Sequence, residues 1–326
     1  MYDIISIGSA TLDVFLRSKG LEIEKENGAK EICVRYGAKI SVDELYFESG
    51  GGGTNTAVTF ARQGLKVASI VKVGDDFAGE KIKRDLEKEG IDIKKIVTEI
   101  GGLTDYSTIL WAPDGGRTIL VYRGKTKLEE DEIPFDQLET KWFYVTSVEG
   151  NFNVIEKCVV HCMGSGIKIA WNPGMNEIQQ REILSAMLND ITLLNLNKEE
   201  MAEVLGVEVL KVNDLLKKAQ ELPCEYVVIT DDRNGSYLHK KRDNFWWHCG
   251  IFEDVPKYES TGAGDAFGSG LVTGFIKELS INDCLKLATA NASSVVSRVG
   301  AKKGILKAQE LNNWLKKDIR VEKVEI

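Results

Sequence analysis

The sequence lacks a block of basic residues, and its net charge is negative. Lysine and arginine number 42 against 50 aspartates and glutamates, which gives a formal net charge of −8 over 326 residues. Nucleic acids bind to a positive surface that neutralises their phosphates. The composition therefore argues against a nucleic-acid-binding protein. An anionic ligand must instead be held by backbone N–H groups and a metal ion.

Cysteines and long apolar runs are also scarce. Six cysteines in a chain of this length are too few for a disulfide scaffold. No apolar run reaches the roughly 18 residues that a membrane-spanning helix needs. No secretory signal opens the sequence, because Met1 is followed directly by strand-like residues from Asp3 to Ile7. We expect a cytoplasmic protein with reduced thiols and no membrane partner.

Two phosphate-binding signatures are absent as well. The P-loop motif Gly-x-x-x-x-Gly-Lys-Ser/Thr occurs nowhere in the chain. The first predicted strand is followed by Gly8-Ser-Ala-Thr-Leu-Asp13, not by the Gly-x-Gly-x-x-Gly of dinucleotide-binding folds. The chain is therefore neither a P-loop protein nor a dinucleotide-binding protein of that type.

Strand-like apolar runs alternate with amphipathic helical patterns along most of the chain. This alternation predicts an α/β fold, a mainly parallel sheet flanked by helices on both faces, in one domain over residues 1–326. Ligands of such sheets bind beyond the carboxyl ends of the strands. The predicted strands are Ile4–Gly8, Val67–Val73, Phe143–Thr146, Ile167–Trp171, Ile191–Leu194 and Tyr226–Thr230, and the helices between them are Thr54–Gln63, Gly79–Glu89, Glu177–Asn189, Lys198–Leu205 and Asp214–Glu221.

Two stretches interrupt the alternation. Residues 12–47 are polar and favour strands, and residues 105–122 are typical of a hairpin that turns at Asp114-Gly-Gly116. We expect their strands to pair into a small β-sheet lid that projects over the ligand site. The last third of the chain is helical from Ala263 to about Lys316.

The strongest chemical signal is Glu259-Ser-Thr-Gly-Ala-Gly-Asp-Ala-Phe-Gly-Ser-Gly270, which opens a predicted helix. Gly262 and Gly264 let the backbone approach a ligand, and the helix N-terminus offers free N–H groups and a positive dipole end. Such a site suits a γ-phosphoryl group in its transition state, and Asp265 in the first turn could accept the proton of an attacking alcohol. Taken alone, the segment is explained equally well by an aspartate that complements the helix dipole.

A second signal is Ser49-Gly-Gly-Gly-Gly-Thr-Asn-Thr-Ala57. Ordering four consecutive glycines before an apolar helix costs conformational entropy. Such a run is expected where a ligand must lie directly against the backbone. Asn55 supplies an amide that both donates to and accepts from a hydroxyl. The alternative interpretation is a flexible loop with Thr54 as the helix cap.

A third signal is Asn197-Lys-Glu-Glu200, which follows a predicted strand. Its simplest interpretation is a capping box, with Asn197 as N-cap and Glu200 reaching back from the third helical position. The functional interpretation is a group of oxygen ligands that holds hydrated Mg²⁺ beside phosphates. The two interpretations are compatible.

These three elements, in this order, resemble the ribokinase (PfkB-type) carbohydrate kinase family. The likeness extends from the Gly8 strand to Gly300-Ala301, and Thr261-Gly-Ala-Gly-Asp265 is its most specific part. The resemblance implies an ATP- and Mg²⁺-dependent kinase that phosphorylates a hydroxyl of a small sugar, with a large α/β part and a β-sheet lid. It also suggests a homodimer formed through the lid.

The resemblance further implies roles for individual residues. Asp265 corresponds to the catalytic base, and Gly262, Ala263 and Gly264 correspond to the anion hole. Asp13, Gly51, Gly52 and Asn55 match positions that contact the sugar. Asn197, Thr230, Gly235, Thr261 and Asn291 match positions near the nucleotide, and Glu200 matches a residue that acts on Mg²⁺ through water.

Three departures from the family pattern leave questions open. Gly52 stands where ribokinases proper carry a lysine, so ribose itself does not follow. Asp232 occupies a position usually held by glycine, where a carboxylate repels phosphates unless it turns away or pairs with Arg233. Glu259 replaces the common aspartate of a monovalent-cation loop, which leaves a K⁺ requirement open.

Two alternatives compete with a sugar kinase. A nucleoside kinase of the same fold would also act on a ribose hydroxymethyl, and Tyr106 and Trp111 on the lid could stack on a base or pack against a second lid. The other alternative is a binding protein that kept the fold and lost turnover, against which the retention of Asp265 and its glycines argues. The sequence leaves the identity of the sugar or nucleoside and the phosphorylated hydroxyl open.

Overall fold

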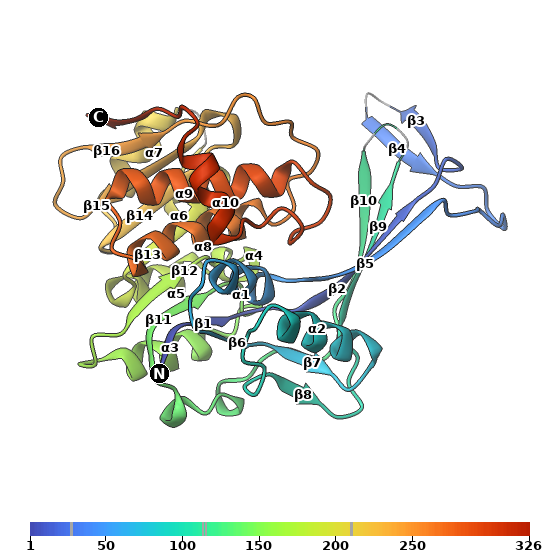
Figure 1. Cartoon of the computed structure of the whole chain (residues 1–326), viewed down its shortest axis with the longest axis horizontal. Helices are drawn as coiled ribbons and strands as arrows, with labels where there is room; N and C mark the ends of the chain where they lie inside the picture. Colours follow the sequence, from blue (N-terminus) through green and yellow to red (C-terminus); the bar gives the residue numbers. More distant parts are fainter. Residues whose placement is uncertain (27–28, 113, 115, 209–210) are drawn as a thin grey trace.

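The structure, a computed structural model, describes residues 1–26, 29–112, 114, 116–208 and 211–326. A large α/β body carries a smaller group of strands that projects from one side (Figure 1). The helices are α1 (Gly52–Arg62), α2 (Phe77–Lys88), α3 (Phe152–Cys162), α4 (Met175–Ile178), α5 (Arg181–Met187), α6 (Lys198–Leu205), α7 (Val212–Ala219), α8 (Ala263–Ile276), α9 (Ile281–Val296) and α10 (Ala308–Leu315), with 3-10 turns η1 (Glu130–Glu132), η2 (Phe135–Gln137), η3 (Leu188–Asp190) and η4 (Asp232–Asn234).

A nine-stranded sheet forms the centre of the body. Its strands, in spatial order, are β17 (Val321–Val324), β16 (Trp246–Cys249), β15 (Ser236–Lys240), β14 (Tyr226–Thr230), β13 (Leu193–Asn197), β12 (Lys168–Trp171), β11 (Thr140–Val145), β1 (Tyr2–Ile7) and β6 (Val67–Ile70). The strands from β6 to β14 are parallel, and β15 to β17 extend the sheet with antiparallel pairs. The predicted mainly parallel sheet is confirmed.

Helices cover both faces of this sheet because successive strand residues point to opposite sides. Ile5 belongs to a core with side chains of α3 to α7, whereas its neighbour Ile4 belongs to a core with side chains of α1, α2, α8 and α9. Both isoleucines are fully buried. Apolar residues at consecutive positions are therefore required, which explains the continuous apolar runs in the sequence.

The projecting strands are the lid that the two interrupting stretches predict. They are β10 (Arg117–Tyr122), β9 (Asp105–Trp111), β2 (Thr11–Arg17) and β5 (Glu44–Gly50), paired in that order (Figure 1). A separate pair, β3 (Glu22–Glu26) and β4 (Ala29–Cys33), lies in the first stretch. The hairpin of β9 and β10 is antiparallel as predicted, although Gly115 in its turn lies outside the described residues.

Two predicted elements are divided in the structure. The run Val67–Val73 forms β6 in the central sheet and then β7 (Lys72–Gly74), which pairs with β8 (Val97–Glu99) in a small sheet. The predicted helix Glu177–Asn189 is broken between α4 and α5. Glu177 is fully buried, and its carboxylate accepts N–H bonds from Val148 at 2.9 Å and Gly150 at 2.7 Å.

Among the described residues, no helix combines the length and apolar character of a membrane span.

Candidate active site

The start of helix α8 is shaped by a left-handed glycine. Gly262 is its N-cap, with φ 76° and ψ 3°, and a Cβ at this position would lie 2.7 Å from the Cβ of Ala301. Only glycine combines this conformation with such close packing. The Ala263 N–H already donates to the Ser260 carbonyl at 3.2 Å. The anion hole assigned to residues 262–264 therefore depends on the remaining N–H groups of the first turn, which have no acceptor within the helix.

Asp265 lies in this first turn and is partly buried. Its Oδ2 accepts a 2.9 Å hydrogen bond from Nδ2 of Asn55, so the structure joins the two glycine-rich elements. Burial raises the pKa of Asp265, and the Asn55 hydrogen bond and the charge of Lys302 oppose that rise. A carboxylate with a raised pKa is a stronger proton acceptor, as a general base requires.

The glycine-rich segment before α1 packs closely against the protein itself. Gly51 has φ 89°, and a Cβ there would lie 2.7 Å from the Cα of Ala10. A Cβ on Gly52 would lie 2.6 Å from Oγ1 of Thr146. These two glycines are thus required by packing, whatever ligand they also contact. A lysine at position 52 would have to displace Thr146, which gives a structural reason for this departure from the family pattern.

Asn55 and Asp13 lie next to this segment. Asn55 is 5% exposed, and its Oδ1 has no hydrogen-bond partner in the part of the chain that the structure describes. Asp13 on β2 accepts a 3.1 Å bond from the Thr11 hydroxyl. Burial raises the pKa of Asp13, while Lys302 and hydrogen bonds from Ser107 and Thr11 act in the opposite direction. Buried groups with unused hydrogen-bonding capacity are typical of a polar ligand site.

A cavity of about 250 Å³ opens in front of Asp265. Asn197 and Glu200 lie in it and form the predicted capping box, because Asn197 Oδ1 accepts from the Glu200 N–H at 2.8 Å and Glu200 Oε2 accepts from the Asn197 N–H at 2.9 Å. Burial raises the pKa of Glu200. The lining residues are Asn172, Asn195, Leu196, Asn197, Glu200, Thr230, Gly262, Gly264 and Asp265.

A second cavity of about 170 Å³ shares Thr230 and Gly264 with the first. Thr230, Gly235 and Gly264 line it together with apolar side chains such as Phe252 and Phe267. An apolar slot next to a helix N-terminus suits a flat base joined to phosphates. Thr261 lies in the turn before Gly262.

Asn291 does not line this second cavity. It is fully buried, and its amide donates to the Ala266 carbonyl at 2.8 Å and accepts from the Leu306 N–H at 2.9 Å. These bonds connect α9 to α8 and to the segment before α10. The prediction of Asn291 as a nucleotide contact is therefore not supported by its position.

Asp232 forms an ion pair with Lys257 and not with its sequence neighbour Arg233. Its carboxylate lies 2.5 Å from Nζ of Lys257, and both side chains line the second cavity. The pair reduces the negative charge at the cavity mouth, which removes the objection that Asp232 repels phosphates.

An ion pair connects the lid to the segment that leads into α8. Arg117 of β10 lies 2.6 Å from Glu259, whose other oxygen accepts the Gly300 N–H at 2.9 Å. Glu259 is 9% exposed. A small cavity lined by Phe15, Trp111 and Tyr258 adjoins this pair.

The family follows from comparison with known proteins. The pattern of the pfkB family carbohydrate kinases matches residues 1–308. The chain belongs to this family. As a pfkB kinase it is an ATP-dependent phosphotransferase with an alcohol group as acceptor.

Individual relatives agree with this assignment. The pfkB kinase is 28% identical over 284 residues to a ribokinase of Haemophilus influenzae, covering 82% of this chain and 87% of that one. It is 24% identical over 278 residues to a nucleoside kinase of Methanocaldococcus jannaschii, covering 85% and 86%. The structure of an Arabidopsis thaliana ribokinase complexed with ribose and ATP has the same fold, with a TM-score of 0.80 at 19% identity over 97% and 99% of the two chains.

Sequence reasoning missed three polar residues of this pfkB kinase. Asn172 and Asn195 line the first cavity at the carboxyl ends of β12 and β13. The rule that ligands bind beyond these ends could have found them. Lys302 has no comparable signal in the sequence. It reaches the site only because the loop that follows α9 folds back against the start of α1.

Proposed function

We propose that this kinase transfers the γ-phosphate of ATP to a hydroxymethyl group of a small sugar, with Asp265 as the general base. The observation that carries the proposal is the position of Asp265. It borders a cavity in the first turn of α8, and one carboxylate oxygen accepts a hydrogen bond from Asn55. The second, apolar cavity, which Gly264 also lines, is proposed to hold the base of ATP.

In the proposed reaction, Asp265 accepts the proton of the acceptor hydroxyl as its oxygen bonds to the γ-phosphorus. The bond between that phosphorus and the β,γ-bridging oxygen breaks, and ADP leaves. N–H groups at the start of α8 stabilise the charge that spreads over the phosphoryl oxygens. Asp13 and Asn55 orient the acceptor, and closure of the lid over it would exclude water and so prevent ATP hydrolysis.

The first cavity also suits Mg²⁺. Its donors are carboxylate and amide oxygens, and Oδ1 of Asn195 is buried without a hydrogen-bond partner among the described residues. When bound, Mg²⁺ would neutralise phosphate charge, and we propose that Glu200 and Asn197 hold it through water. We propose no K⁺ requirement, because Glu259 already bonds the Arg117 guanidinium and the Gly300 N–H.

A nucleoside is the second candidate acceptor. It is supported by the likeness to a nucleoside kinase and by Trp111, an aromatic lid residue beside a cavity that Tyr258 also lines. The experiment is an ADP-release assay over a panel of sugars and nucleosides. We expect release that depends on the added acceptor, with a sugar preferred by at least about tenfold in kcat/KM, a difference of about 1.4 kcal/mol.

Each other result of the panel has a defined meaning. Preference for a nucleoside would reverse the order of the two candidates. ADP release that is the same with and without any acceptor would contradict phosphoryl transfer to an alcohol.

The six cysteines are free thiols, which supports a reducing compartment such as the cytoplasm for this reaction.

We also propose a homodimer that forms through the lid. Support comes from β10, an edge strand of the lid sheet with exposed apolar residues, among them Leu120 (57%) and Tyr122 (49%). Exposed apolar edges favour pairing with another chain.

Sedimentation velocity tests the dimer. We expect two copies for the wild type and a dissociation constant raised at least about tenfold by Leu120→Glu, because the charge would be buried in the interface. Ile183→Glu, at an exposed position of α5 on the body, is the matched control and should leave the dimer intact. A single copy for the wild type, or equal effects of the two variants, would refute the lid interface.

A further inference from the structure

We propose that Lys302 is a positioning residue of this kinase: it fastens the glycine-rich start of α1 and places a positive charge beside the catalytic carboxylate. The inference rests on the proposed function, because it concerns the role of Asp265. It assigns a task to a residue that lies 37 positions beyond Asp265 and outside the three sequence signals.

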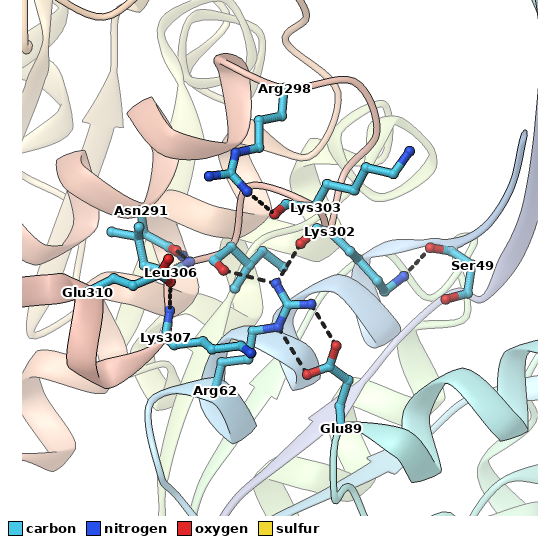
Figure 2. Close-up of polar contacts among 11 residues, drawn as sticks. Ser49, Arg62, Glu89, Asn291, Arg298, Lys302, Lys303, Leu306, Lys307 and Glu310 are labelled. Carbon is cyan, nitrogen blue, oxygen red and sulfur yellow. Dashed lines mark hydrogen bonds and ion pairs between the residues drawn. The ribbon is translucent and has the colours of Figure 1, made fainter.

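The first support is the set of contacts that the Lys302 ammonium group makes. Nζ donates to the Ser49 carbonyl and, at 2.7 Å, to the Thr54 hydroxyl. Figure 2 shows the side chain extending from its loop toward Ser49. The Thr54 hydroxyl also donates to the Gly50 carbonyl at 2.6 Å. One ammonium group therefore joins both ends of the glycine run that precedes Asn55.

This contact affects Asp265 through one further hydrogen bond. Asn55 follows Thr54 directly, and its Nδ2 donates to Asp265 at 2.9 Å. Four consecutive glycines have little conformational preference of their own. A cation that bonds the carbonyl before them and the hydroxyl after them restricts the position of Asn55, and Asn55 in turn orients the carboxylate.

The backbone of Lys302 is itself held in place. Arg62 donates from NH1 to the carbonyl of Lys302 at 2.7 Å and to that of Ile305 at 2.9 Å. Its other nitrogens bond Glu89 at 3.0 and 2.6 Å, as Figure 2 shows. Ala301, the preceding residue, packs against Gly262 at the start of α8. The same short loop thus supports the anion-binding turn and the base.

The charges around Lys302 give the second support. The negative charges of Asp13, Asp265, Asp85 and Glu48 favour its charged form, whereas burial disfavours it more strongly and lowers the pKa of Lys302 to about 8. Lys302 is thus still mainly protonated at neutral pH. Its charge opposes the burial that raises the pKa of Asp265. Among the described residues, Asp265 also interacts with the Asn55 amide through a hydrogen bond and with the Tyr144 hydroxyl and the Glu200 carboxylate through its charge, so Lys302 is the cation in this group.

The test is the pH dependence of kcat in Lys302→Met. The base must be deprotonated, so activity falls as pH drops through the pKa of Asp265. Removing the cation leaves burial less opposed and raises that pKa. We expect the acid limb of the kcat profile to move to higher pH by roughly one unit.

Lys303→Met is the matched control. It removes the same charge from the next residue, but Lys303 is 49% exposed and lies 2.5 Å from Glu48. We expect its acid limb to coincide with that of the wild type. The midpoint of the limb does not depend on the amount of folded enzyme where that amount is constant over the pH range, which circular dichroism at each pH verifies. Lys302→Gln, which keeps a donor for Ser49, provides a second neutral variant if the methionine variant does not fold.

An acid limb that stays at the wild-type position in both neutral variants, or that moves equally in Lys303→Met, would overturn the inference. That result leaves the proposed function intact as long as Asp265→Asn lowers turnover by about a hundredfold or more. Normal turnover in Asp265→Asn would instead remove the base, and with it the proposed function.

Discussion

Replacing Asp265 with asparagine is expected to lower turnover by about a hundredfold or more while ATP binding stays within about twofold of the wild type. The amide has nearly the same shape and can still bond Asn55, but it cannot accept a proton. The first cavity and the apolar slot that we assign to ATP keep their lining. Steady-state kcat and the ATP dissociation constant from calorimetry are the two measurements.

A matched control separates catalysis from helix stability. Asp283 occupies the first turn of α9, where it bonds the Ser280 cap, just as Asp265 occupies the first turn of α8. If Asp265 served only the helix dipole, Asp283→Asn and Asp265→Asn would change unfolding and activity alike. We expect Asp283→Asn to retain wild-type turnover. Near-normal turnover in Asp265→Asn would exclude the proposed base.

Gly262→Ala is expected to reduce kcat by about a hundredfold, the loss seen when one donor of an anion site is misplaced. Its φ of 76° disfavours alanine, and the added Cβ would lie 2.7 Å from Ala301. The turn must shift, and the N–H groups that follow it shift with it. Turnover at saturating ATP and acceptor, together with the melting temperature, measures the effect.

Gly90→Ala is the control for backbone strain. Gly90 has the same φ of 76°, follows α2, and has open space for a Cβ as far as the described residues show. Both variants should lose some stability, because alanine disfavours this conformation in either place. Only Gly262→Ala should lose turnover. Equal kcat values for the two variants would mean that the turn before α8 does not bind the phosphoryl group.

The sequence predicted the elements whose cause is local. Two elements have the predicted bounds, the strand Tyr226–Thr230 and the helix Lys198–Leu205. The first is specified by a continuous apolar run and the second by a capping box, and both patterns involve only neighbouring residues. The division of Val67–Val73 between two sheets could not be foreseen, since the run is continuous in the sequence and both parts are buried in the structure. Glu177, in the first part of the broken helix, bonds N–H groups that lie 29 and 27 residues away in the sequence, and no local pattern predicts such contacts.

In the candidate site, too, the residues in local motifs were predicted and those placed by distant contacts were not. Asp265, Asn55 and Glu200 lie in motifs with recognisable spacing. The structure joins Asp265 to Asn55 by a hydrogen bond and places Asp265 and Glu200 in the lining of one cavity. Asn291 lies in no such motif, and its amide turned out to bond backbone inside the body. Lys302 and the partner of Asp232 depend on loops that meet only in three dimensions.

The ion pair between Arg117 and Glu259 has an energetic consequence for opening of the lid. If the lid swung outward, Arg117 would leave a nearly inaccessible carboxylate without its counter-ion, which costs far more than separating two solvated charges. Glu259 also holds the Gly300 amide, next to the residue that packs on Gly262. Opening would therefore disturb the turn that we propose to bind phosphate, so that the kinase would hydrolyse ATP only poorly while its lid is open.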